Sequence, residues 1–575
     1  MNEIEERRWR LYTLMALVIA CSLIVVAKLF YLQVVQHDRY LTIAREERWR
    51  EESIPAKRGA IWDSRGNGLA ATVTYESLYA VPAQVSSPAK TARSLSALLG
   101  EPTERINSLL SSQQKSPALI KSFLTSDKAQ EIRTEARKQE LEVYLEPQFK
   151  RSYPEGSVAS QLVGMVGLDN VGLSGIEAEF NDTLAGKPGS SVAERDTGGD
   201  EIAIAASRYR EAVNGSDVVL TLDRYVQRVI DKELDAAITR HKATGGTIVV
   251  LEPTTGAVLA MASRPTFDLN DPSLFHPSRT PLYRNPAVTD AWEPGSVFKI
   301  VTMAAGLDTH TVTPDHSYDN KGSFSYGGGV VKNAITRVGP ESMAQVLQRS
   351  SNIGAAYVST KLGAEKFYQY VRAFGFGRPS GIDLPGESQG ILKMPGQGNW
   401  RPFDLATNAF GQGVSVTPVQ MASAVAAVAN GGLLMKPFVV SQVVGPHGQA
   451  RRYDPTVVRQ VISPDTAQTL RDMLVSVLEQ IDGGLPKAAK IPGYLSGGKT
   501  GTAEIPTSQG YTGEDMIASF VGFAPAESPR FVILVKIDSP KGADWAETVA
   551  SPVYRLVAQQ LLTYYKVPPM VARAR

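Results

Sequence analysis

The sequence has few of the residues that build crosslinks and metal centres. Cys21 is the only cysteine among 575 residues, so neither an intrachain disulfide nor a thiolate metal site can form. The six histidines are scattered, and none forms the i, i+4 pair typical of a zinc protease. The composition therefore argues against a metal site.

A large charge excess is also missing. Lys and Arg total 60 against 58 for Asp and Glu, which gives a formal net charge of +2. A nucleic-acid-binding protein would carry a strong basic excess or stripe, so we expect no nucleic-acid partner. The length is too great for one hydrophobic core, and the hydrophobic content of 43% is ordinary, so two or three folded units are expected.

The N-terminal segment carries the long apolar run of the chain. Residues 11–35 are apolar with few interruptions, and three arginines precede them. This length can span a bilayer, and the positive-inside rule places the N-terminus in the cytoplasm and the chain after about residue 35 outside. A cleaved signal peptide and a lipoprotein signal at Cys21 are the alternatives. The missing small-x-small cleavage site and the apolar run beyond Cys21 favour an uncleaved single-pass anchor.

The remaining chain divides into two parts by pattern. Charged residues 40–53 predict a solvated helix, and strands and turns follow from Arg58. Short helices are expected within 89–140, with starts at Pro102-Thr103 and Ser126-Asp127. A strand near Asp217 opens the second part. The predicted domains are a cytoplasmic tail (1–10), a transmembrane anchor (11–35), a non-catalytic N-terminal pedestal (36–215) and a catalytic domain (216–575).

One motif supplies a candidate nucleophile and base. Pro294 and the apolar residues after Lys299 predict a helix that begins close to Ser296. Lys299 then lies on the same helix face as Ser296, three residues later. A desolvated lysine near other cations can be neutral enough to accept the serine proton, and the helix N-terminus offers amides to an oxyanion. Alone, Ser-x-x-Lys more often marks exposed helix residues.

Two further motifs carry polar groups that could assist an acyl transfer at Ser296. Ser350 and Asn352 can pass a proton and hold a substrate amide, although alone they are more typical of a turn or a helix cap. Lys499, with Thr500 and Thr502, suits a substrate carboxylate. The glycines around Lys499 would let a peptide add beside an edge strand, although alone they are more typical of a turn.

A phosphate-binding loop is a competing interpretation of the same region. Residues 493–500 fit the spacing of a P-loop letter for letter. Such a loop needs a strand before it and a helix after it. Here Pro492 precedes, and Gly501, Pro506 and Gly510 follow, so we reject nucleotide binding.

Ser-x-x-Lys, Ser-x-Asn and Lys-Thr-Gly occur in the order known from penicillin-binding proteins and class A β-lactamases. With the segments that accompany them, the chain resembles the class B penicillin-binding proteins over nearly its whole length. The supporting segments are Thr289–Trp292, Gly381–Glu387, Phe410–Pro418, Arg58–Asp63, Arg151–Pro154 and Gly172–Glu177. The resemblance implies an α/β (α+β) transpeptidase domain with a five-stranded antiparallel sheet flanked by helices, carried on an elongated α+β pedestal with one transmembrane helix.

The resemblance also implies a role for each site residue. Ser296 attacks the carbonyl between the terminal D-alanines of a stem peptide, and Lys299 is the general base. Ser350 passes a proton toward the leaving D-alanine, and Lys499 tunes it. Further roles are implied for Asn352, which positions Lys299 and the substrate amide, for Thr500, Gly501 and Thr502, which bind the terminal carboxylate, and for the amides of Ser296 and Thr502, which form the oxyanion hole. No metal or organic cofactor is implied.

The expected activity is peptidoglycan D,D-transpeptidation in septal cell-wall synthesis, inhibited by β-lactam antibiotics. The length and the segment 410–418 look more like the division (FtsI-like) type than the elongation type. The expected partners are stem peptides, a multi-pass SEDS-type polymerase, other division proteins and the bacterial cell membrane. Alternatives are an elongation-type transpeptidase, a D,D-carboxypeptidase and a non-catalytic β-lactam-binding scaffold. A class A β-lactamase is disfavoured because no Glu-x-x-Leu-Asn motif is present.

Overall fold

The computed structural model describes residues 3–40, 49–112, 114–167, 169–194, 208–479, 487–505, 515–542 and 545–570. By packing, the chain forms two units. One unit consists of Met1–Lys57 with Gly186–Asn214, and the other of Arg58–Ala185 with Gly215–Arg575.

The first unit contains the apolar N-terminal helix and a small sheet. Helix α1 (Glu3–Phe30) continues into the π-helical turn η1 (Tyr31–Val35). Its segment Arg8–Val35 is long and apolar enough to cross a membrane, with a mean hydropathy of 2.4, and none of its most apolar stretch is buried against the rest of the protein. The exposed apolar surface of this helix fits single-pass membrane anchoring.

The sheet of this unit corrects one expectation. Trp49–Ile54 forms strand β1, which pairs antiparallel with β6 (Gly189–Glu194), and β6 pairs with β7 (Arg208–Arg210). The helix predicted over 40–53 is therefore wrong for residues 49–53, because a partner strand distant in sequence overrides the local charge pattern. Residues 41–48 lie outside the described residues.

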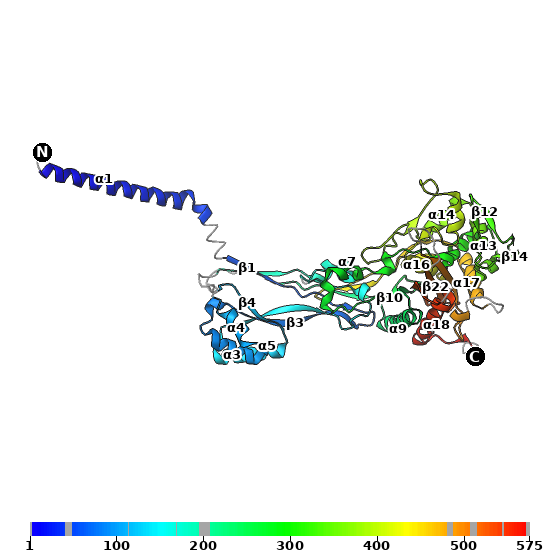
Figure 1. The fold of residues 1–575 in the computed structure, drawn as a ribbon, viewed down its shortest axis with the longest axis horizontal. Helices are drawn as coiled ribbons and strands as arrows, with labels where there is room; N and C mark the ends of the chain where they lie inside the picture. The colour runs from blue at the N-terminus through cyan, green and yellow to red at the C-terminus, as the bar shows by residue number, and fades with distance from the viewer. Residues whose placement is uncertain are drawn as a thin grey trace. The chain divides into compact units, whose positions relative to one another are not determined.

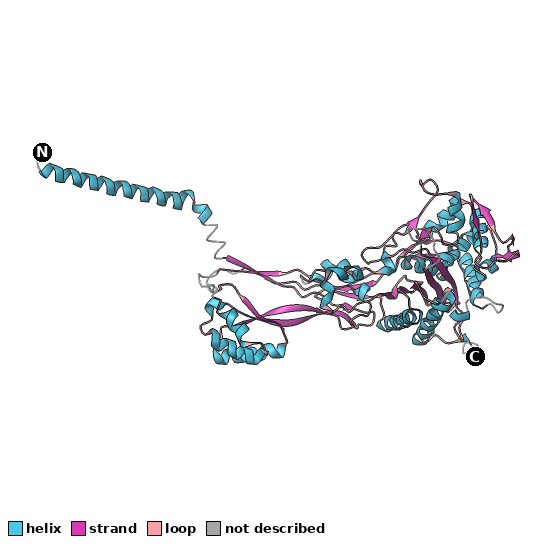
Figure 2. Cartoon of the chain, in the orientation of Figure 1, coloured by secondary structure: helices cyan, strands magenta, loops and turns pink. Residues whose placement is uncertain are grey.

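The second unit begins with a long twisted sheet, seen as magenta strands in Figure 2. Strand β3 (Gly68–Ala80) pairs with β5 (Tyr144–Ser152) along nine residues. The strand order is β19-β18-β8-β2-β3-β4, with β5 also on β3. The other bounds are β2 (Ile61–Trp62), β4 (Ala118–Leu124), β8 (Asp217–Leu220), β18 (Val440–Val444) and β19 (Ala450–Arg452). The predicted boundary at 215/216 thus precedes a strand that is hydrogen-bonded to β2.

Three helices pack beside this sheet and share a small hydrophobic core with strands β3 and β4. They are α3 (Pro88–Leu99), α4 (Thr103–Leu110) and α5 (Ser126–Gln139). The starts predicted at Pro102-Thr103 and Ser126-Asp127 are confirmed. Local capping explains the second start, because the Thr125 side chain accepts a hydrogen bond from the Lys128 amide.

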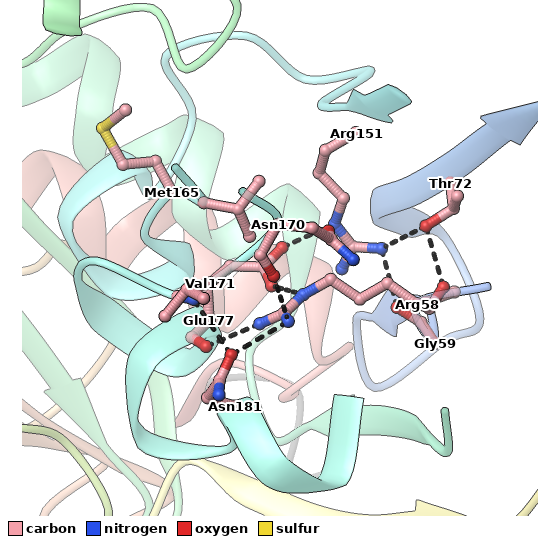
Figure 3. A network of polar contacts seen from close by, with 12 residues as sticks. Arg58, Gly59, Thr72, Arg151, Met165, Asn170, Val171, Glu177 and Asn181 are labelled. Atoms are coloured by element: carbon pink, nitrogen blue, oxygen red, sulfur yellow. Dashed lines mark hydrogen bonds and ion pairs between the residues drawn. The ribbon is translucent and has the colours of Figure 1, made fainter. Parts of the chain in front are cut away.

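Three motifs distant in sequence meet in one buried ion cluster (Figure 3). The Arg58 Nε donates to Glu177 Oε2 at 2.7 Å, and the Arg151 Nε donates to Glu177 Oε1 at 2.6 Å. Arg58 Nη2 also donates to the Glu177 carbonyl, and Arg151 Nη1 to the Gly59 carbonyl. Glu177 has no exposed side-chain surface. The cluster ties the start of the second unit to β5 and to helix α7 (Gly175–Glu179).

The C-terminal part of the second unit is built on a five-stranded sheet of order β10-β9-β23-β22-β21, antiparallel throughout. The strands are β9 (Gly245–Leu251), β10 (Val258–Arg264), β21 (Gly497–Glu504), β22 (Met516–Ala524) and β23 (Phe531–Asp538). Helices α9 (Arg224–His241) and α18 (Ala546–Tyr564) pack together beside it (Figure 1). The predicted five-stranded sheet with flanking helices is confirmed.

Neighbouring side chains of β22 show which helices lie on each face. Phe520 packs its ring against Tyr554 of α18, with centroids 4.5 Å apart. Ser519, which points the other way, lies beside Gly501 and the turn that holds Val297. The hydrophobic helix α16 (Pro418–Ala429), buried along its whole length, also packs against the sheet. The helix start with the candidate nucleophile is thus pressed onto the sheet opposite α18.

Candidate active site

Ser296 lies at a helix start, as its motif predicts. The 3-10 turn η5 (Gly295–Phe298) leads directly into α11 (Lys299–Asp308). Residues Lys299 to Leu307 are all buried, and this apolar helix fixes the Lys299 backbone in the core. The Lys299 ammonium returns toward the preceding turn, where its Nζ lies 2.9 Å from Ser296 Oγ.

Lys299 Nζ has four polar neighbours. Besides Ser296 Oγ, it contacts the Ser350 carbonyl oxygen at 2.6 Å, Asn352 Oδ1 at 2.7 Å and Ser350 Oγ at 3.2 Å. Asn352 is oriented by its other amide atom, since Nδ2 donates to the Lys332 carbonyl. A carbonyl and an amide oxygen can only accept. A neutral amine would donate its two hydrogens to these oxygens, which leaves its lone pair for the Ser296 hydroxyl.

Ser350 and Asn352 reach Lys299 from a short linker between two helices. Helix α12 (Met343–Gln348) ends just before them, and α13 (Asn352–Leu362) starts there. Ser351 is the N-cap of α13, and its Oγ accepts from the Gly354 amide at 3.1 Å. Ser350 itself has a φ of 55°, a left-handed conformation that is uncommon for a serine.

Lys499 arrives from the other side, on the edge strand β21. Its Nζ donates to Ser350 Oγ at 3.0 Å, so Ser350 lies between two lysines. The strand context also disposes of the phosphate-loop interpretation, since Lys499 and Thr500 lie inside a strand and no helix follows them directly.

The structure shows why strand β21 carries glycine at three positions, and the sequence predicts this only in part. A Cβ on Gly501 would lie 2.5 Å from Ser519 Oγ and 2.8 Å from the Pro294 carbonyl, so only glycine lets the nucleophile turn pack this closely. Gly497 and Gly498 were expected to make room for a bound peptide. Their open side is instead filled by the rings of Phe523 and Phe520.

Burial acts on both lysines, which are each 1% exposed, and like charge adds to it at Lys299. Desolvation, aided by the Lys499 charge, holds the pKa of Lys299 well below its ordinary value, and Glu341 opposes this. Desolvation lowers the pKa of Lys499 to about 7, and Glu547 opposes it. Desolvation also raises the pKa of Glu547 to about 7. The environment thus favours a neutral Lys299, which is the form that can act as a base.

A cavity of about 140 Å³ opens over this cluster. Ser296, Ser350, Asn352, Thr500 and Thr502 all line it. Polar side chains from all three motifs therefore converge on one cleft, while the two lysines are not among its lining residues. Within the described ranges, no group of three or more His, Cys, Asp or Glu side chains could hold a metal ion.

Three residues of the site region were missed by the sequence reasoning. Glu341 and Trp545 line the cavity, and Glu547 acts on Lys499. None belongs to a recognisable motif, and each comes from an element that only the tertiary structure brings to the site. Glu341 precedes the Ser350 motif by nine residues, too far for local spacing to link them.

Comparisons with known proteins agree with this architecture. The family model described as penicillin binding protein transpeptidase domain matches residues 246–559, and that of the penicillin-binding protein dimerisation domain matches residues 53–220. Stage V sporulation protein D of Bacillus subtilis is 35% identical over 98% of this chain and 86% of its own length. The probable peptidoglycan D,D-transpeptidase PenA of Neisseria gonorrhoeae is 31% identical over 96% of this chain and 92% of its own.

Peptidoglycan D,D-transpeptidases and penicillin-binding proteins recur among the similar chains. The peptidoglycan D,D-transpeptidase FtsI of Escherichia coli is 27% identical over 98% of this chain and 92% of its own. The crystal structure of penicillin binding protein 3 of Mycobacterium tuberculosis complexed with ampicillin has a TM-score of 0.71 and 29% identity, and covers 90% of this chain and 97% of that one. The chain belongs to the class B penicillin-binding proteins, the peptidoglycan D,D-transpeptidases that carry a transpeptidase domain on a dimerisation-domain pedestal.

Proposed function

We propose that the acyl transfer uses Ser296 as nucleophile and Lys299 as its general base. The observation that carries this is the set of contacts at Lys299 Nζ, where two obligate acceptors leave the lone pair facing Ser296 Oγ at 2.9 Å. As Ser296 Oγ bonds to the carbonyl carbon between the two terminal D-alanines, its proton moves to Lys299. The backbone amides of Ser296 and Thr502 would receive the oxyanion.

The second half of acylation needs a proton at the leaving nitrogen. Ser350 Oγ lies between Lys299 Nζ and Lys499 Nζ, at 3.2 and 3.0 Å, and so can relay a proton from Lys299 to the departing D-alanine. The C–N bond breaks, D-alanine leaves with that proton, and an ester to Ser296 remains. An amine of a neighbouring stem peptide then attacks the ester, the new peptide bond forms, and Ser296 regains its proton.

Substrate recognition is assigned to the same edge strand. Lys499, Thr500 and Thr502 would bind the terminal carboxylate, with Gly501 keeping the strand close to the nucleophile turn. Asn352 would position Lys299 and the substrate amide. β-Lactams would acylate Ser296 because they present a reactive amide with a carboxylate at the same spacing.

The apolar helix and the relatives support a proposal for the cellular setting. We place the N-terminus in the cytoplasm and the catalytic domain outside the cell membrane, because three arginines precede the apolar run 11–35. The similarity to FtsI, PenA and the sporulation protein supports a septal role beside a SEDS-type polymerase and other division proteins. A fluorescent fusion at the division site, with filamentation on depletion, tests this. Rounding of the cells on depletion would instead indicate an elongation role.

The nucleophile is tested by labelling the full-length chain in detergent with a fluorescent penicillin, beside Ser296→Ala. We expect a stable adduct that the mutant lacks. A folded wild type that takes no label would favour the scaffold alternative, and equal labelling of both proteins would place the nucleophile elsewhere. Release of D-alanine without dimeric muropeptides would indicate a carboxypeptidase.

A further inference from the structure

The backbone conformation of Ser350 must be held by contacts from outside its own motif. Its left-handed φ of 55° is a strained conformation for a side chain with a Cβ, and such strain persists only where neighbouring contacts hold it. Ser350 contributes two atoms to Lys299, its carbonyl oxygen and Oγ. A small relaxation of this linker would therefore misplace the base and the proton relay together.

The neighbouring residue, Ser351, is where that support enters. Ser351 Oγ accepts from the Gly354 amide at 3.1 Å and from Asn333 Nδ2 at 3.2 Å. Because Tyr318 donates its hydrogen to Glu341, Ser351 is the donor across the 3.1 Å contact between Ser351 Oγ and Tyr318 Oη, and Asn333 Oδ1 lies farther from Ser351 Oγ, at 3.4 Å. Ser351 is thus bound on three sides, and it holds Ser350 and Asn352 on either side of it.

Tyr318 in turn donates its own hydrogen to Glu341. The distance from Tyr318 Oη to Glu341 Oε2 is 2.6 Å, which is typical of a hydrogen bond to a carboxylate. The two residues face each other across the strand pair β11 (Ser317–Asn320) and β14 (Gly339–Ser342). The Tyr318 ring also stacks on Tyr357 of α13 at 5.0 Å. The hydrogen bonds therefore run in one direction, from the Ser351 hydroxyl to Tyr318 and from Tyr318 to the Glu341 carboxylate.

Glu341 is a buried carboxylate with little direct compensation. It is 2% exposed, accepts a further bond from Asn320 Nδ2 at 3.3 Å, and its closest cation is Arg349 Nη1 at 3.9 Å. A buried carboxylate that lacks a close ion pair is costly, so the presence of Glu341 near the buried Lys299, on which its charge acts, calls for a role.

We propose that Glu341 is a positioning residue of the acylation reaction. Through Tyr318 and Ser351 it holds the Ser350–Asn352 linker against Lys299, and its charge stabilises Lys299 once that lysine has taken the Ser296 proton. This inference rests on the proposed roles of Ser296 and Lys299. It adds to the site a carboxylate from β14 that touches none of the reacting atoms.

The charged groups around Lys299 determine in which direction the loss of the Glu341 charge shifts the pKa of Lys299. Lys299 faces the cation Lys499 from β21 and the anion Glu341 from β14, and its other partners are neutral. Glu341 faces Arg349, and Arg337 lines the same cavity, while Glu547 acts on Lys499 from α18. Because Glu341 raises the pKa of Lys299, loss of its charge must lower that pKa further. The acid limb of the acylation rate, where Lys299 becomes protonated, then moves to lower pH.

Two variants of the full-length chain separate charge from positioning. Glu341→Gln keeps an acceptor for Tyr318 and removes the charge, so we expect the acid limb to move to lower pH and the plateau rate to fall because the base is weaker. Tyr318→Phe keeps the charge and breaks the link to Ser351, so we expect a plateau about tenfold lower and an unmoved acid limb. Glu365→Gln, an exposed carboxylate on α14 (Ala364–Ala373), is the matched control.

The readout is the second-order rate of acylation by a fluorescent penicillin as a function of pH, with thermal unfolding measured for each variant. Wild-type rates and pH profiles in both variants would overturn the proposal. An acid limb in Glu341→Gln that stays in place or moves to higher pH would overturn the role of the charge. If Glu341→Gln does not fold, an unchanged plateau in Tyr318→Phe overturns the positioning role. A wild type that is not acylated refutes the proposed function instead, so the two failures are distinguishable.

Discussion

Replacing Lys499 by methionine tests whether Lys499 acts on Ser350 by hydrogen bonding and on Lys299 by its charge. Methionine has a similar length and no branch, so it fits the fully buried position without opening a cavity. What is removed is the charged donor to Ser350 Oγ at 3.0 Å. A hydrogen bond from a charged group contributes roughly 1.5–3 kcal/mol, so the acylation rate at its plateau should fall about 10- to 150-fold.

The same substitution has a second effect of known sign. The Lys499 charge is the second cause, after desolvation, that lowers the pKa of Lys299. Lys499 carries this charge below its own pKa of about 7. Without it, the pKa of Lys299 rises, and the neutral base becomes available only at higher pH. The acid limb of the acylation rate should therefore move to higher pH, opposite to the direction expected for Glu341→Gln.

The assay is time-resolved labelling of the full-length chain by a fluorescent penicillin across the pH range in which the protein stays folded. Lys366→Met removes an exposed lysine and serves as the control. An unchanged plateau, or an acid limb that moves to lower pH, would refute the view that Lys499 acts on Ser350 by hydrogen bonding and on Lys299 by charge.

Two further predictions concern the pedestal cluster and the carboxylate behind Lys499. Glu177→Ala leaves the Arg58 and Arg151 guanidinium groups buried without their anion, so thermal or urea unfolding should report a loss of about 3–5 kcal/mol, whereas the exposed Glu179→Ala should be neutral. Equal stability of both variants would contradict the ion cluster. Glu547→Gln removes the charge that raises the pKa of Lys499, so binding of a D-Ala-D-Ala stem peptide should weaken at lower pH than in the wild type. A KM profile that shifts to higher pH would contradict this.

Local sequence determined much of this protein. The apolar run of α1, the helix starts at Thr103 and Ser126 and the alternation of apolar strand residues follow from short-range periodicity and capping, which act over a few neighbours. The glycine and proline pattern after Thr500 also sufficed to reject a phosphate loop, and residues 497–504 form a strand. The three motifs and the segments around them were enough to indicate the family.

Tertiary structure alone decided which groups act on one another. The strand at 49–54 exists because β6 pairs with it from more than a hundred residues away, against the local charge pattern. Gly497 and Gly498 are glycines because the rings of β22 fill the space beside them. Glu341 and Glu547 carry no motif, and their effect on the lysines depends on burial and distance, which local sequence does not encode. Electrostatics acts through space, so the charge state of Lys299 is a property of the fold and not of its motif.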